Sequence, residues 1–320
     1  MSEAVIRALT VPTGPRPVPS PDDARRVTDP LTDRDFQLAL WMLYELHYRG
    51  FDGIDPDLEW DPLLIAARRP MEAALEAAVR ELAAVDDEPT TAKEVATALT
   101  RMTNGCGAGE LATFLGRHAT KTQFREYLAE RAVYHLHESD PQSFVLPRID
   151  GPAKVALAEL QYDEYGSGRP DRIHAGLYAK ALTSLGIPTD LLTHVDRAEA
   201  TTLASVNTMS LFALNRRLRG AALGHLAAFE ATSSLPCAAI AEGARRLGLP
   251  PEVADYYDEH VEADAVHEQL AIRDICGALV ENEPALGADV VLGAAACLAV
   301  DGLAADVLLD RWRDLRSAAS

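Results

Sequence analysis

The segment HVEADAVH, residues 260–267, carries two histidines and an aspartate at successive spacings of four and three residues. At about 100° per residue on an α-helix, His260, Asp264 and His267 lie within about 60° of one another. Three side chains that can bind a metal therefore point in one direction. Two imidazoles and a carboxylate suit iron or zinc, but the spacing is not the HExxH of zinc proteases. The alternative interpretation is a polar helix face with chance histidines.

Helical patterns surround this segment, and turn signals separate them. Helices are expected over 32–48, 70–84, 124–138, 152–165, 171–185, 201–232 and 251–282, with a last pair within 285–317 and a flexible glycine-rich connection over 100–118. No alternating strand pattern and no internal repeat is present. The sequence therefore predicts an all-α bundle.

Three regions are expected along the chain. Residues 1–30 contain six prolines and predict a disordered or extended tail. Residues 31–120 predict an N-terminal helical extension packed on the core. The core itself is assigned to residues 121–320, where almost the whole sequence is helical.

Composition narrows the classes of function. Thirty basic and forty-nine acidic residues give a net charge of −19, which disfavours nucleic acid and anionic membrane surfaces as partners. The most apolar run, 287–309, contains three aspartates, so we interpret it as a buried core helix and not as a membrane span. The four cysteines are scattered and predict neither disulfides nor a zinc–cysteine site. With no signal peptide pattern at the N-terminus, the expected location is the cytoplasm.

Glu230 is the only carboxylate in the apolar stretch GAALGHLAAFEATSSLPCAAIA, residues 220–241. A carboxylate buried among such neighbours must be paired, protonated or bound to a cation. Two interpretations stay open: an ion pair with Arg216 or Arg219, or a metal ligand.

Two further groups of polar residues can also be interpreted either as metal ligands or as residues with a structural role. Glu164 and His174 are ten residues apart and would not share a face of an ideal helix, but the sequence GSGRP, residues 166–170, breaks the helix and allows them to converge. They are either metal ligands or a cap and a surface histidine. Glu138, in the segment YHLHESDPQ over 134–142, is either part of a helix end or a ligand.

Together these residues supply three or four carboxylates and three histidines from several helices, which is the inventory of a carboxylate-bridged di-iron site. The Glu-x-x-His pair of ferritin-like proteins does not occur anywhere in the sequence. A di-iron site in this chain therefore requires another scaffold.

The motifs resemble those of the haem-oxygenase-like di-iron oxidases and oxygenases, the iron-containing redox enzyme family. The resemblance rests on EYGSG from residue 164 with a histidine at 174, the lone acid in LAAFE, and YYDEHVEADAVH, and it covers roughly residues 120–315. It implies a haem-oxygenase-like bundle without haem that binds two Fe²⁺ per chain. It implies these ligands: Glu164, His174, Glu230, His260, Asp264 and His267, with Glu138 as a seventh.

The resemblance also implies an oxidoreductase that uses O2 on a small-molecule substrate of the amino acid, amine or fatty acid type, by desaturation, C–C cleavage or N-oxygenation. Family habit suggests a homodimer. Two alternatives remain. One is a metal-free haem-oxygenase-like enzyme of the thiaminase or quinone-cofactor oxidase type. The other is a non-catalytic helical interaction protein.

Overall fold

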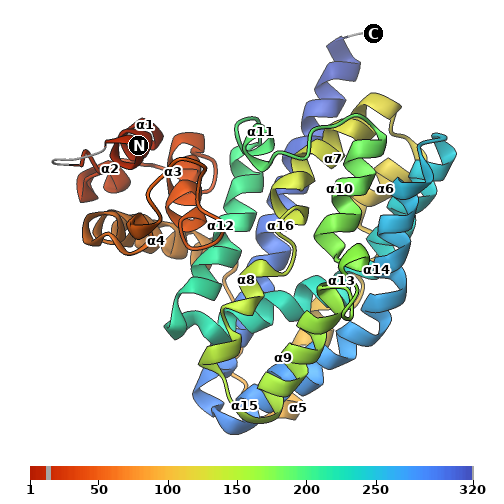
Figure 1. Ribbon diagram of the computed structural model, residues 1–320. Coiled ribbons are helices and arrows are strands. Elements are labelled where there is room, and N and C mark those ends of the chain that lie inside the picture. The colour runs from red at the N-terminus through yellow and green to blue at the C-terminus, as the bar shows by residue number, and fades with distance from the viewer. Residues whose placement is uncertain (12–15, 319–320) are drawn as a thin grey trace.

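A computed structural model of the chain describes residues 1–11 and 16–318, and the side chains of these residues except 262–266 and 314–318. The described residues are helical with no strand, so the predicted all-α fold class is confirmed (Figure 1).

The helices of the first half are α1 (Ser2–Thr10), α2 (Pro21–Arg25), α3 (Arg34–Glu45), α4 (Pro62–Leu82), α5 (Ala92–Thr103), α6 (Gly109–Arg117), α7 (Lys121–His135), α8 (Asp140–Ser143) and α9 (Gly151–Glu164). Those of the second half are α10 (His174–Ser184), α11 (Leu191–Val195), α12 (Ala200–Leu214), α13 (Arg219–Arg246), α14 (Pro251–Gln269), α15 (Ala278–Asn282) and α16 (Gly287–Ala318). A π-helix, η5 (Leu270–Gly277), joins α14 to α15, and 3₁₀ helices lie at η1 (Pro56–Trp60), η2 (Leu146–Arg148), η3 (Pro170–Arg172), η4 (Arg216–Leu218) and η6 (Pro284–Leu286).

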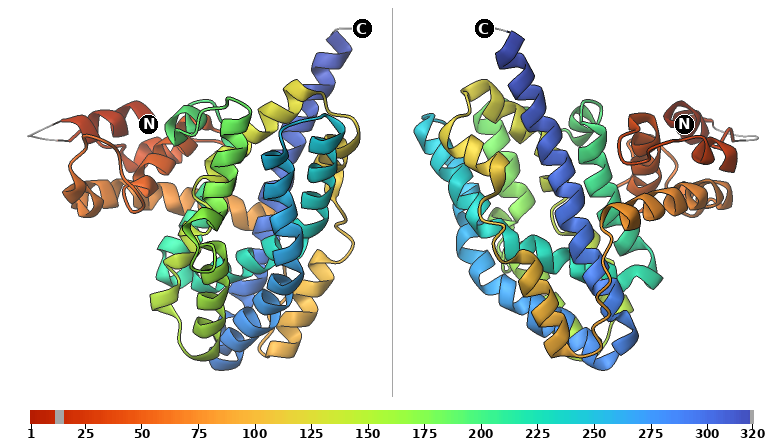
Figure 2. Two further views of the ribbon diagram at one scale, coloured as in Figure 1. Left: turned by 45° about the vertical axis from the view of Figure 1, so that its right-hand side comes forward. Right: turned by 180° about the vertical axis from the view of Figure 1, so that it is seen from behind.

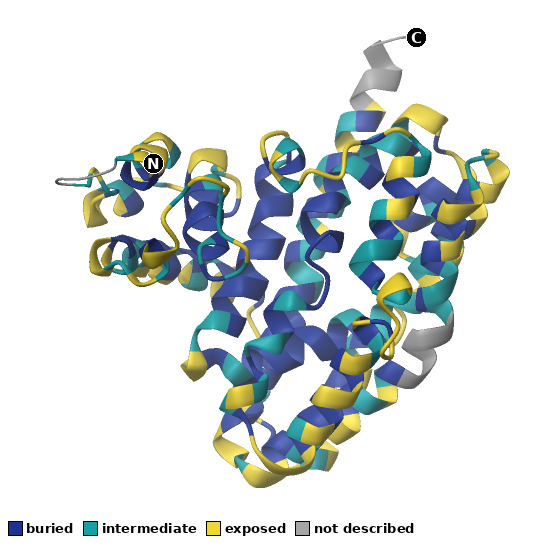
Figure 3. Cartoon of the chain, in the orientation of Figure 1, coloured by how far each residue is buried: buried dark blue, intermediate teal, exposed yellow. Residues whose placement is uncertain are grey.

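The long helices form one bundle, with α13 packed between α14 and α16, and α10 between α7 and α14 (Figure 2). Helices α1 to α4 form a lobe that packs against α12 on one side of this bundle. Buried residues follow the inner faces of the helices, and exposed residues lie on their outer faces and in the turns (Figure 3).

The expected tail contains two helices. In α1, Val5, Ala8 and Leu9 are buried against α3 at helical spacing, and the terminal amino group pairs with Asp35. In α2, Ser20 caps a helix that begins with a proline, the residue whose missing N–H costs least at that position. The high proline content of residues 1–30 favours the prediction of a tail, and the two helices are too short to show a clear periodic pattern in the sequence.

Three other segments differ from the expectation. The helix predicted over 201–232 is broken at Asn215, whose backbone is extended and whose side chain donates hydrogen bonds to Glu72 and to the Leu211 carbonyl oxygen. The pair predicted within 285–317 is the single helix α16. The segment expected as a connection over 100–118 contains the end of α5 and all of α6.

By length and composition, Pro284–Arg313 could cross a membrane, alone among the helices of the described chain. However, 56% of its most apolar window is buried inside the bundle, as in the core helix of a water-soluble protein. The expectation of a core helix agrees with this packing.

Helices α13 and α16 approach each other through two glycines. A Cβ atom on Gly224 would lie 1.8 Å from the Val290 carbonyl oxygen, and one on Gly293 would lie 1.9 Å from the Ala221 carbonyl oxygen. Backbone atoms therefore touch where a side chain would normally separate the helices. This contact sets the position of α13, the helix that carries Glu230.

We predict that Gly224→Ala destabilises the protein by about 1–3 kcal/mol or more, because the helices must separate. Gly302→Ala on α16 is the matched control, since nothing lies within 4 Å of its added Cβ and alanine favours helix. Urea denaturation of both variants checks this. Equal stability of the two variants would contradict the close contact.

Candidate metal centre

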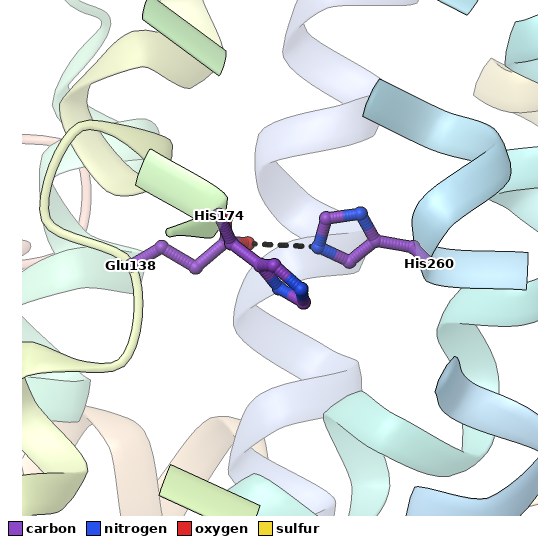
Figure 4. Close-up of side chains that lie close together, drawn as sticks. All are labelled: Glu138, His174 and His260. Carbon is purple, nitrogen blue, oxygen red and sulfur yellow. Dashed lines mark ion pairs between the residues drawn. The ribbon is translucent and has the colours of Figure 1, made fainter. Parts of the chain in front are cut away.

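Three of the predicted residues form a first group, which comprises Glu138, His174 and His260. Glu138 follows the end of α7, His174 is the first residue of α10, and His260 lies on α14 (Figure 4). One ligand atom from each lies within 4.8 Å of the others. The Glu138 Oε1 atom is 3.5 Å from His260 Nε2, and the two imidazole rings are 4.5 Å apart. Helices α7, α10 and α14 thus deliver three donors to one point.

A second group comprises Glu164, Glu230 and His267, again with ligand atoms within 4.8 Å of one another. Glu164 is the last residue of α9, Glu230 lies on α13, and His267 lies near the end of α14. The His267 Nδ1 atom is 3.7 Å from Glu164 Oε1 and 3.5 Å from Glu230 Oε2. This buried nitrogen makes no hydrogen bond.

The two groups adjoin, because His174 Nδ1 of the first lies 3.1 Å from Glu164 Oε2 of the second. The turn between α9 and α10 brings these residues together. Gly166 and Gly168 adopt φ of +84° and +78°, and a Cβ on Gly166 would lie 2.4 Å from the Arg169 carbonyl oxygen. The break that the sequence shows at residues 166–170 therefore closes the ten-residue gap.

Six of the seven residues predicted as ligands gather in this place, and all six are buried. Glu138, which has a second interpretation as a helix-end residue, is among them. Neither Arg216 nor Arg219 forms an ion pair with Glu230 within 4 Å, whereas Arg219 pairs with Glu283. The side chain of Asp264 lies outside the described residues.

The electrostatics of the first group are dominated by its single carboxylate. Burial would raise the pKa of Glu138, but the rings of His135 and His260 outweigh burial and hold that pKa well below its usual range. Burial would likewise lower the pKa of His174, but the neighbouring carboxylate of Glu164 raises it. The carboxylates here thus favour positive charge on their neighbours.

In the second group the carboxylates stabilise positive charge on the neighbouring histidine more strongly. Burial opposes protonation of His267, yet Glu230, Glu164 and Asp163 together raise its pKa to about 9. In the absence of another cation, a proton on this ring balances the carboxylates. A divalent metal ion would supply that charge instead, and it would require the ring nitrogen in its neutral form.

Three neighbours of the centre were not predicted as site residues. The first is Tyr256, one helical turn before His260. Its hydroxyl donates to Glu138 Oε2 over 2.8 Å and lies 2.7 Å from His135 Nδ1, the second neighbour. The third is Asp163, whose Oδ2 lies 3.4 Å from His267 Nε2. Each lies close in sequence to a predicted ligand: Tyr256 four residues before His260, His135 three residues before Glu138, and Asp163 next to Glu164.

These neighbours orient the histidine rings. The Tyr256 carbonyl oxygen can only accept a hydrogen bond, so at 2.8 Å the His260 Nδ1 atom must donate to it, which leaves Nε2 directed at Glu138. Asp163 likewise holds Nε2 of His267 and leaves Nδ1 facing the carboxylates. Metal-binding histidines commonly have such a partner on the second nitrogen, and the donor set therefore fits a metal.

A cavity of about 420 Å³ adjoins the first group. Glu138 and His260 line it, together with His135 and Tyr256, whereas the three residues of the second group do not. The α12 and α13 helices contribute Thr202, Phe229 and Thr232 to its wall.

Comparisons with known proteins concern the family and the fold. The family model described as iron-containing redox enzyme matches residues 125–302, more than half of the chain. The crystal structure of a CADD-like protein of unknown function from Nostoc punctiforme is similar at a TM-score of 0.50 and 16% sequence identity, covering 75% of this chain and 97% of that one. At that identity the likeness concerns the fold alone. No curated protein matches the chain.

We predict that Tyr256→Phe lowers the free energy of unfolding of the metal-free protein by about 1–3 kcal/mol, because the buried Glu138 carboxylate loses a hydrogen-bond donor. Tyr162→Phe is the control, since the Tyr162 side chain is 56% exposed. Urea denaturation measures both. If the two variants agree within about 0.5 kcal/mol, Tyr256 does not support Glu138.

Proposed function

Because the chain belongs to the family of iron-containing redox enzymes, we propose that it is a non-haem di-iron oxidase or oxygenase that uses O2 on a small-molecule substrate. The observation that carries the proposal is the pair of adjoining groups, each with three buried donors from separate helices. Three carboxylates and three histidines suit iron, which binds mixed nitrogen and oxygen donors.

Each group would hold one of two metal ions, and only the first group adjoins the cavity. Glu138, His174 and His260 would hold the iron next to the cavity, and Glu164, Glu230 and His267 would hold the other. Glu164 lies between the groups, with its carboxylate oxygens 3.1 Å from His174 Nδ1 and 3.7 Å from His267 Nδ1, so its carboxylate would help to hold the metal. The described donors suffice for this assignment, and Asp264 is proposed as a further ligand from its spacing alone.

Bound iron supplies the one-electron chemistry and the O2 binding that amino-acid side chains lack. The protein's own residues supply the rest. Tyr256 can hold or pass a proton at Glu138 Oε2, and His135 Nδ1 lies within reach of the same hydroxyl. Asp163 and the Tyr256 carbonyl oxygen keep the two α14 histidines in fixed orientations, so little reorganisation is needed when a metal binds.

The two groups differ in their access to the cavity. Substrate can approach Glu138 and His260 directly, whereas the second group is enclosed by α9, α13 and α14. We therefore propose that the substrate reacts next to the first group. This arrangement favours the oxygenase proposal over a non-catalytic interaction protein, which has no need of a cavity beside buried histidines and carboxylates.

We predict that anaerobic addition of Fe²⁺ to the purified protein gives about two bound irons per chain. His260→Ala and His267→Ala should each weaken iron binding by at least about tenfold, because each removes a ligand from one group. His118→Ala on the exposed end of α6 is the control. Iron content after desalting and an Fe²⁺ titration measure the effect.

The same samples are then exposed to O2 and followed by absorbance and oxygen uptake. Wild-type protein that binds no iron, even with amino acids, amines and fatty acids present, would contradict the di-iron proposal and favour the metal-free alternative. Iron binding that survives in both histidine variants would place the metal elsewhere.

A further inference from the structure

The cavity beside the first group carries a positive charge that no protein group neutralises directly. Arg131 lies on α7 one turn before His135, Glu138 follows the end of that helix, and all three line the cavity. Within the described residues, the Arg131 guanidinium makes no hydrogen bond and no ion pair within 4 Å. Its contact is with the ring of Tyr134, 5.7 Å from the guanidinium carbon.

An arginine without a partner in such a place is costly. The guanidinium stays protonated at any ordinary pH, and it offers five donors in a planar fork that matches a carboxylate. Removing it partly from water without an anion costs several kcal/mol. Protein structures retain such a group most readily where a ligand supplies the missing anion.

A negative charge lines the same cavity from α16. The Asp301 carboxylate accepts a hydrogen bond from the Ser205 hydroxyl on α12. Burial opposes the charge on Arg131, but Asp301 together with Tyr127, Tyr178 and Tyr134 outweighs burial, so the pKa of Arg131 is raised. Arg131 and Asp301 nevertheless have no charged atoms within 4 Å of each other. Apart from Glu138 of the first group and the exposed Glu110 and Asp306, the cavity thus presents one cation and one anion that are separated.

We propose that this cavity binds a substrate with an α-amino acid group, whose carboxylate pairs with Arg131 and whose ammonium pairs with Asp301. The proposal rests on the proposed function, in that this bound molecule is the one presented to the iron. A zwitterion is the ligand that neutralises both side chains at once. A simple fatty acid would leave Asp301 facing an apolar chain, and a simple amine would leave Arg131 without an anion.

The positions of the charged residues also orient the molecule. Arg131 lies one turn before His135, the last residue of α7, and Glu138 lies in the turn that follows. Between Arg131 and Glu138 the wall includes His135, Phe229 and Tyr256. The substrate's side chain therefore extends past these rings towards Glu138 and His260, and the atoms that react lie on the side chain and not at the amino acid group.

Binding is tested by isothermal titration calorimetry on iron-loaded protein without oxygen. The twenty proteinogenic L-amino acids are screened first. Each one that binds is compared with the acid that lacks its amino group and with the amine that lacks its carboxylate, for example L-phenylalanine with 3-phenylpropanoate and 2-phenylethylamine. We expect at least one amino acid to bind, and both analogues to bind at least tenfold more weakly.

Two variants assign the charges. Arg131→Met should weaken the amino acid and the acid analogue at least tenfold and leave the amine unchanged, whereas Asp301→Asn should weaken the amino acid and the amine and leave the acid unchanged. Arg117→Met and Asp274→Asn are matched controls on exposed residues. Circular dichroism and the melting temperature show that each variant is folded.

The outcomes separate this inference from the proposed function. No binding by any of the twenty amino acids, or acid analogues that bind as tightly as the amino acids, would overturn the inference. So would amino acid binding that both variants leave unchanged. Iron content is measured on every sample. Protein that binds an amino acid but no iron would support the inference and contradict the di-iron proposal. Protein that binds iron but no amino acid would support the di-iron proposal and contradict the inference.

Discussion

The burial of three carboxylates in one place is the constraint on which the rest of this structure depends. Glu138, Glu164 and Glu230 are each nearly inaccessible to water, and the basic side chains nearest to them among the described residues are histidines and not lysines or arginines. Buried negative charge without a permanent cation is unfavourable, since desolvation is not repaid. The raised pKa values of His174 and His267 show how the protein balances that charge with protons, and a metal ion can take their place.

The surrounding fold holds these side chains by short, specific contacts. The turn through Gly166 brings the end of α9 next to the start of α10, and the glycine contact between α13 and α16 fixes the helix of Glu230. Arg172, just before α10, pairs with Glu259 of α14 and so ties together the two helices that carry His174 and His260. A centre built from five separate elements depends on such contacts because an error of about 1 Å is enough to disturb a functional site.

The two groups have unequal access to the cavity, and this inequality organises the proposed chemistry. Glu138 and His260 reach the cavity, whereas Glu230 and His267 are enclosed. The end of α7 carries Arg131 and His135, and Glu138 lies in the turn directly after the helix. Substrate recognition and metal binding would therefore use one short segment of the chain, which limits how far the charged end of the substrate can lie from the reacting centre.

The sequence by itself determined the all-α class, the common face of His260 and His267, and the isolation of Glu230, because helical periodicity and local composition are properties of neighbouring residues. It did not reveal the short helix α1, the break at Asn215, or the roles of Tyr256 and Asp163. It also gave no sign that Arg131 and Asp301 share a cavity. Those relationships join residues far apart in the chain, and they depend on how helices pack. Only the tertiary structure decided whether Glu164 and His174 met across their broken helix, since a glycine turn permits many directions and packing selects one.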